Sequence, residues 1–209
     1  MFRQKSFADM AMLVSIVTPV FNSEKYIEQT IASVRAQTHT NWEHIIVDDC
    51  SSDQSEKLIR TLQAEDARIK YHRLETNSGA AIARNTAIKI AKGDYLTFLD
   101  ADDIWFPEFI TKSMNALEAH NVGFVFASYE RRDENLNPIL KDFIVPKKVT
   151  YTDILKSNSI SCLTAFLDIK RLGKKYMPLI RKRQDMGLWV SYLKEYEIRD
   201  IERGRTCYS

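Results

Sequence analysis

Residues 93–103 read Gly-Asp-Tyr-Leu-Thr-Phe-Leu-Asp-Ala-Asp-Asp, an apolar run that ends abruptly in acids. We expect the apolar part to form a buried strand. Asp100 and Asp102 then lie just past its carboxyl end, where open α/β sheets bind ligands. Side chains two positions apart on an extended segment point the same way. Two carboxylates on one side of a pocket suit a divalent cation that bridges phosphates.

Strand and helix patterns alternate around this run. The predicted strands are 13–18, 43–47, 69–74, 95–99 and 122–128. The predicted helices are 24–37, one after Asp53 whose pairing with Glu56 resembles a capping box, 80–92, and one that opens at Pro107. This order predicts an α/β fold with a mainly parallel sheet and helices on both faces.

The chain from about residue 130 is less regular. We expect a short helix capped by Thr152 or Asp153, an apolar strand over 162–169, and a helix over 184–196. The aromatic residues in this half and in the strand before it have core spacing, and no ligand role is assigned to them: Phe124, Phe126, Phe166 and Trp189.

Composition narrows the class of protein. At 209 residues the chain forms one domain, and its net charge of +2 argues against nucleic acid as a partner. The scattered Cys50, Cys162 and Cys207 fit neither a disulfide framework nor a zinc site. No apolar run approaches the roughly 18 residues of a membrane span, and residues 1–12 lack a secretory core. We therefore expect a cytoplasmic protein, with peripheral association with the inner face of the plasma membrane left open.

Acids follow the predicted strands. In a parallel sheet these strand ends share one edge, so Asp49, Asp100 and Asp102 would lie close together and repel unless a cation or a donor-rich ligand such as a nucleoside is bound. The alternative is that each acid caps a helix. We favour capping for Asp53 and Asp103, but capping does not require the pair at 100 and 102.

Basic residues mark two further segments. The turn 77–79 precedes a helix that carries Arg84, which suits an anion site, although a simple turn with a solvated arginine explains it too. Residues 181–185 read Arg-Lys-Arg-Gln-Asp. Asp185 is either a general base aimed at an acceptor hydroxyl or a charge favoured at a helix N-terminus. The basic run could bind phosphate, face an anionic membrane, or form a solvated turn.

Four segments together resemble a known family. They are VSIVTPVFN at 14–22, IVDDCSSD at 46–53, NSGAAIARN at 77–85 and FLDADD at 98–103. Their order and spacing resemble the inverting family 2 glycosyltransferases of the GT-A fold, over residues 13–194. Residues 145–151 and 181–189 are similar to bacterial enzymes of cell-wall and surface-polysaccharide assembly, teichuronic acid glycosyltransferases among them.

The resemblance implies a reaction and a role for each motif residue. A sugar would pass with inversion from a UDP-sugar donor to a glycan or lipid-linked saccharide acceptor, and Mn²⁺ or Mg²⁺ would offset charge on the leaving UDP. The implied roles are base pocket for Pro19 and Phe21, uracil recognition for Asp49, nucleotide contact for Arg84, ribose or metal contact for Asp100, metal ligation for Asp102, and catalytic base for Asp185.

The resemblance also divides the chain. Residues 1–12 are an N-terminal extension and 13–199 are the GT-A domain, with a nucleotide-sugar-binding half at 13–129 and an acceptor half at 130–199. Residues 200–209 are polar, lack the family pattern and are expected to be an altered or truncated tail, so that a membrane or a protein partner could cover exposed apolar surface. Cys50 stands where the family has glycine, and Phe21 where tyrosine is usual.

Two other functions compete with this interpretation. One is a truncated, non-catalytic homologue that binds nucleotide-sugar without turnover. The other is a nucleotidyltransferase, which ranks last because residues 13–22 lack a glycine-rich loop with a basic residue.

Overall fold

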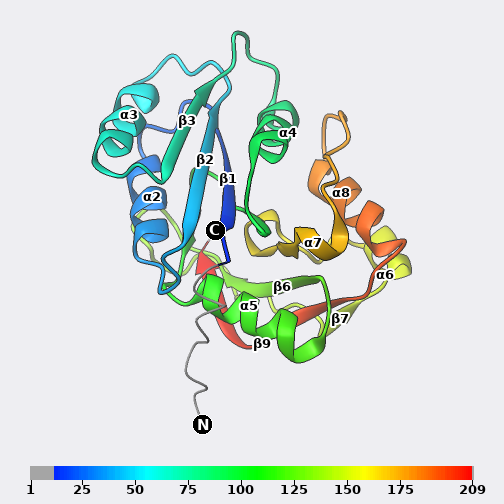
Figure 1. The fold of residues 1–209 in the computed structure, drawn as a ribbon. Helices are drawn as coiled ribbons and strands as arrows, with labels where there is room; N and C mark the ends of the chain where they lie inside the picture. The colour runs from blue at the N-terminus through cyan, green and yellow to red at the C-terminus, as the bar shows by residue number, and fades with distance from the viewer. Residues whose placement is uncertain (1–11, 209) are drawn as a thin grey trace.

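The computed structural model describes residues 12–208, with side chains described for 12–201. One nine-stranded sheet has the order β3-β2-β1-β4-β8-β6-β9-β5, and β7 pairs with β9 (Figure 1). The strands are β1 Val14–Val20, β2 Trp42–Asp48, β3 Ile69–Arg73, β4 Tyr95–Phe98, β5 Ile104–Trp105, β6 Phe124–Glu130, β7 Lys148–Val149, β8 Phe166–Asp168 and β9 Ile198–Tyr208. The helices are α2 Ile27–Arg35, α3 Ser55–Glu65, α4 Ala80–Ile90, α5 Phe109–His120, α6 Tyr151–Lys156, α7 Ile169–Leu172 and α8 Gln184–Leu193, with a 3₁₀ turn at Cys162–Thr164.

The first four strands form a parallel unit. β1 pairs in parallel with β2 and β4, and β2 pairs in parallel with β3. Alternate residues of β1 enter different cores, because successive side chains of a strand point to opposite faces. Ile16 packs with residues of α2, α3 and α5, whereas Val17 packs with residues of α4 and α8. The predicted α/β fold with helices on both faces of the sheet is confirmed (Figure 1).

The second half of the sheet is mixed. β8 is antiparallel to both β4 and β6, so it separates two strands that run in the same direction. The strand predicted over 162–169 is present but shorter, since a 3₁₀ turn precedes β8 and α7 follows it. Asp168 ends β8 because its side chain accepts a hydrogen bond from the backbone N–H of Arg171 and so starts α7.

Residues 200–208, which the sequence analysis set apart as a polar tail, belong to β9. This strand pairs in parallel with β6 and antiparallel with β5 and β7. Backbone groups make these bonds, so the polar composition concealed a strand that begins with the buried Ile198 and Ile201. The polar segment 200–208 is thus part of the sheet.

The predicted helix caps also need correction. The N-cap position of α3 is occupied by Gln54 and not by the predicted Asp53. Asp53 instead accepts hydrogen bonds from the backbone N–H groups of Ser55 and Glu24. Asp103 precedes β5 and caps no helix. Thr150, two residues before the first of the expected caps, caps α6, and Asp153 completes a capping box with it.

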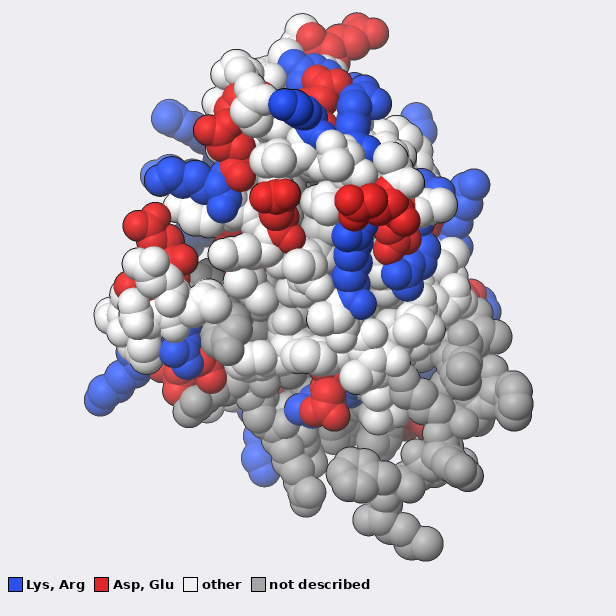
Figure 2. All heavy atoms as spheres, turned by 90° about the vertical axis from the view of Figure 1, so that its left-hand side faces the viewer, with Lys and Arg blue, Asp and Glu red and all other residues white. Residues whose placement is uncertain are grey.

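The face that carries α2 and α3 mixes charges of both signs (Figure 2). Ion pairs join several of them, including Arg35 with Glu65 and Arg60 with Glu56. Over residues 12–208, every helix is too short or too polar to cross a bilayer.

Candidate functional site

The strand ends meet at a cavity of about 340 Å³. Its lining includes all six residues that the sequence analysis assigned to nucleotide or metal: Pro19, Phe21, Asp49, Arg84, Asp100 and Asp102. They come from the ends of β1, β2 and β4 and from α4, four separate parts of the chain. The parallel strands therefore bring the predicted residues together. Phe21 is 51% exposed, so its aromatic side chain is accessible for stacking on a planar ligand.

The two acids after β2 have different surroundings. Asp49 lines the cavity, and its carboxylate accepts hydrogen bonds from the backbone N–H groups of Ser78 at 2.6 Å and Gly79 at 2.8 Å. Gly79 has a φ of +91°, a conformation that favours glycine. Asp49 thus fixes the loop that leads into α4.

Asp48 is fully buried and serves the fold. It accepts hydrogen bonds from Tyr71 Oη at 2.6 Å, Arg73 Nη1 at 3.1 Å and the backbone N–H of Ser51 at 2.7 Å. Burial raises the pKa of Tyr71, and the bond to Asp48 raises it further. Cys50, two residues after Asp48, has a φ of +67°, which explains why glycine suits this position.

Arg84 and Asp100 form the central ion pair of the site. Arg84 Nη2 lies 2.5 Å from Asp100 Oδ1, and the two side chains are 12% and 32% exposed. Burial lowers the pKa of Arg84, but the charge and hydrogen bond of Asp100, together with the charges of Cys162 and Asp185, outweigh this effect, so the net shift is upward. Arg84 Nε is buried without a hydrogen-bond partner within the described part of the chain.

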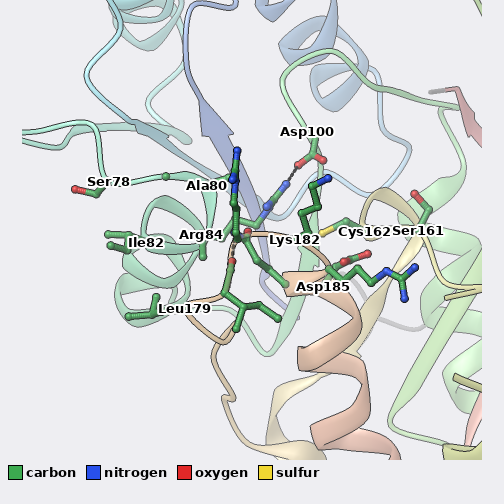
Figure 3. Close-up of a pocket in the computed structure, with 16 residues that line it drawn as sticks. Ser78, Ala80, Ile82, Arg84, Asp100, Ser161, Cys162, Leu179, Lys182 and Asp185 are labelled. Atoms are coloured by element: carbon green, nitrogen blue, oxygen red, sulfur yellow. Dashed lines mark hydrogen bonds and ion pairs between the residues drawn. The ribbon is translucent and has the colours of Figure 1, made fainter. Parts of the chain in front are cut away.

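A second cavity of about 740 Å³ adjoins the first and shares Ala80, Arg84 and Asp100 with it. Asp185, in the first turn of α8, lines this cavity together with Ser161 and Cys162 (Figure 3). Asn158 Nδ2 donates a hydrogen bond of 2.8 Å to Asp185 Oδ2. Burial raises the pKa of the Cys162 thiol. All seven predicted site residues therefore line two cavities with a common wall.

Three contributors were not found from the sequence. Asn158 orients Asp185, Cys162 forms part of the wall, and Asn85 joins α4 to the segment before α8. Asn85 Oδ1 accepts from the backbone N–H of Met177 at 2.8 Å, and Asn85 Nδ2 donates to the Met177 carbonyl at 2.9 Å. Asn85 lies inside the NSGAAIARN motif, which was its only signal. No pattern marked Asn158 or Cys162, because their partners are distant in sequence.

The donor atoms can be tested against a divalent cation. Asp102 is exposed at the cavity and makes no hydrogen bond or ion pair with any residue whose side chain is described. Asp100 uses Oδ1 for its ion pair with Arg84. In residues 12–201 no cluster of three or more acidic, histidine or cysteine side chains is arranged to hold a metal. Mg²⁺ commonly takes one or two carboxylates and completes its shell with phosphate and water, so Asp100 and Asp102 fit such an ion.

Known proteins share this sequence pattern and fold. Residues 15–167 match the family model "Glycosyl transferase family 2". The chain is 42% identical over 183 residues to TuaG of Bacillus subtilis (strain 168), a glycosyltransferase named for teichuronic acid biosynthesis, covering 88% of this chain and 73% of that protein. It is 40% identical over 195 residues to WfgD of Escherichia coli, covering 93% of this chain and 75% of that protein. The name of WfgD describes a UDP-Glc:alpha-D-GlcNAc-diphosphoundecaprenol beta-1,3-glucosyltransferase.

A solved structure gives the same answer for the fold. The crystal structure of S. aureus TarS in complex with UDP superimposes with a TM-score of 0.78 at 25% identity, over 95% of this chain. This chain spans 60% of that solved chain. With the family model covering most of the sequence, the chain belongs to glycosyl transferase family 2 and has the GT-A fold.

Proposed function

We propose that the protein transfers a sugar from a UDP-sugar to a glycan or lipid-linked saccharide acceptor, with inversion, in the synthesis of a bacterial cell-wall or surface polysaccharide. The observation that carries this proposal is the pair of adjoining cavities, one with the predicted nucleotide residues and one with Asp185. The names of TuaG and WfgD support the process, and the UDP bound to TarS supports the nucleotide.

The smaller cavity would hold the UDP part of the donor. Phe21 offers an exposed ring for the base, with Pro19 beside it in the lining. Asp49 already accepts two backbone hydrogen bonds, but a carboxylate has about four lone-pair sites and can also accept from the uracil N–H. Arg84 would contact the nucleotide from the wall that both cavities share.

Asp102 and Asp100 would hold Mn²⁺ or Mg²⁺ at the diphosphate. The exposed carboxylate of Asp102 and the pocket they share support this assignment. When bound, such an ion supplies Lewis-acid stabilisation of the leaving UDP.

Asp185 would act as the base. Asn158 occupies Oδ2 of its carboxylate, which fixes the plane of the group and leaves Oδ1 for a proton from the acceptor hydroxyl. The oxygen would then attack the anomeric carbon on the face opposite UDP, which inverts its configuration. We accordingly assign the donor half to residues 13–129 and the acceptor half to 130–199. The proposed compartment is the cytoplasm, which keeps thiols reduced and supplies nucleotide-sugars.

The test is direct measurement of UDP release and glycan product with UDP-sugars and a lipid-diphosphate-linked GlcNAc acceptor. Asp185→Asn should bind UDP in calorimetry like the original protein and form little product. UDP binding without any product across a broad acceptor panel would refute transfer and support a non-catalytic homologue. Absence of UDP binding would refute the donor site.

A further inference from the structure

The segment between α7 and α8 combines solvent-exposed apolar side chains with positively charged side chains. Tyr176, Leu179 and Ile180 are 49%, 72% and 49% exposed, and Arg181, Lys182 and Arg183 follow them directly. The sequence has no Asp or Glu from 169 to 184, although the whole chain has a net charge of only +2. We call the six named residues the docking surface.

The three cations of the docking surface are available to a partner. Arg181, Lys182 and Arg183 are exposed and form no ion pair or hydrogen bond through their side chains with residues 12–201. Neighbouring lysines are already engaged, since Lys175 pairs with Glu195 at 2.7 Å and Lys174 bonds to the Ala91 carbonyl at 2.6 Å. The positive charge of the docking surface is therefore not neutralised by the described chain.

The docking surface is held in place, so its exposed apolar groups are a property of the fold. Asn85 on α4 makes two hydrogen bonds to the backbone of Met177, whose side chain is 2% exposed. Gln184 Nε2 donates to the Ile180 carbonyl at 2.8 Å. Ile82 of α4, itself 36% exposed, lies on the same side of the cavity as Leu179 and away from Asp185 (Figure 3).

This arrangement matches the chemistry of an anionic bilayer surface. Aliphatic and tyrosine side chains enter the boundary between headgroups and acyl chains, while arginine and lysine attract the lipid phosphates. Leu179, Ile180 and the three cations also line the larger cavity. A bilayer docked here would lie beside the opening that contains Asp185.

We propose that the docking surface binds the protein to the surface of an anionic membrane and holds the larger cavity at the headgroups. The proposal rests on the proposed function in one respect: a lipid-linked acceptor would reach the cavity from that membrane. It commits to the bilayer itself as the partner. The measurement below uses neither donor nor acceptor, so it can fail or succeed independently of transfer.

The test is flotation of the full chain with phosphatidylcholine vesicles, with and without phosphatidylglycerol. Binding is expected only with the anionic vesicles, and it should weaken with salt because screening shortens the reach of surface charges. The triple variant Arg181→Gln, Lys182→Gln, Arg183→Gln should bind about a hundredfold more weakly, at about fivefold per cation. The double variant Leu179→Gln, Ile180→Gln should bind the anionic vesicles more weakly than the original protein, by roughly tenfold for each side chain replaced.

A matched control removes similar apolar surface elsewhere. Ile139 and Leu140, in the connection between β6 and β7, are 56% and 58% exposed. Ile139→Gln with Leu140→Gln should leave vesicle binding unchanged, and thermal melts should show all variants folded. Equal binding to neutral vesicles, an equal loss in the control, or no binding by the original protein would each overturn the proposal. If transfer to a water-soluble acceptor persists without vesicle binding, the proposed function stands and the docking surface does not.

Discussion

Replacing Asp100 by alanine should destabilise the folded protein by about 2 kcal/mol, because it leaves the cation of Arg84 buried without its partner. The Arg84 side chain is only 12% exposed, and its Nη2 lies 2.5 Å from Asp100 Oδ1. Its Nε makes no hydrogen bond within the described structure. Loss of the carboxylate therefore removes the main compensation for burying this charge.

The magnitude follows from the burial of the two partners. Breaking a fully buried pair costs about 3–5 kcal/mol, whereas an exposed pair contributes about 0–1 kcal/mol. Asp100 is 32% exposed, so water screens the pair and the expected value lies between these limits. For a chain of this size, each kcal/mol lowers the melting temperature by about 2–4 °C, which gives roughly 4–8 °C for Asp100→Ala.

The assay is thermal unfolding of the original protein, Asp100→Ala and Arg84→Met, with UDP present or absent. Arg84→Met should cost about 1 kcal/mol or less, because the carboxylate that it leaves is a third exposed and can be hydrated. In the presence of a chelator, UDP should raise the melting temperature of Asp100→Ala more than that of the original protein. The reason is that the phosphates of UDP can replace the lost carboxylate as the partner of Arg84. With Mn²⁺ the order should reverse if Asp100 also contacts the metal.

The comparison of the two single variants can refute the reasoning. If Arg84→Met lowers the melting temperature more than Asp100→Ala does, the burial argument is wrong. A change of less than about 1 °C in Asp100→Ala would show that the pair is effectively solvated.

Four further outcomes are expected. Asp185→Asn should lower kcat by about 10²–10⁴-fold. Asn158→Ala should lower kcat with little change in the KM for the donor. Normal turnover by both variants would contradict the assignment of Asp185 as the catalytic base. Cys50→Gly should raise stability by about 1–2 kcal/mol, seen in urea unfolding, because Cys50 has a φ of +67°. Treatment with EDTA should reduce UDP binding in calorimetry, and Asp102→Ala should make the remaining binding insensitive to Mn²⁺; unchanged metal sensitivity would contradict the assignment of Asp102. Burial lowers the pKa of His44 from 6.5 to about 3, so below pH 6.5 the unfolded chain binds a proton that the folded chain excludes. The free energy of unfolding should therefore fall by up to about 1.4 kcal/mol for each pH unit below 6.5. Urea titrations at different pH should show a flatter slope for His44→Gln.

The sequence was most informative where one strand follows another in parallel. Runs such as 14–17 and 45–47 are buried on both faces, so hydrophobicity alone located the strands and the order of elements located their ends. The convergence of Asp49, Asp100 and Asp102 on one cavity follows from that geometry. Local pattern and tertiary position agree in this half of the molecule.

The sequence was least informative where pairing depends on the backbone or on distant partners. β9 is polar and β8 is three residues long, and both are stabilised by ladders that no local pattern reveals. Asp48 and Asp49 are adjacent, yet one is held by Tyr71 and Arg73 and the other by a loop 29 residues away. Only the fold distinguishes which of these two carboxylates faces a ligand.

The position of β8 restricts how the protein can adapt to its ligands. Hydrogen bonds join β8 to β4 on one side and to β6 on the other, so one continuous sheet runs through both halves of the chain. Hinge closure of two rigid bodies would have to break these ladders. Any rearrangement that encloses the donor is therefore expected in the loops and helices outside the sheet, and the chain should show the same distance between β1 and β6 whether empty or loaded.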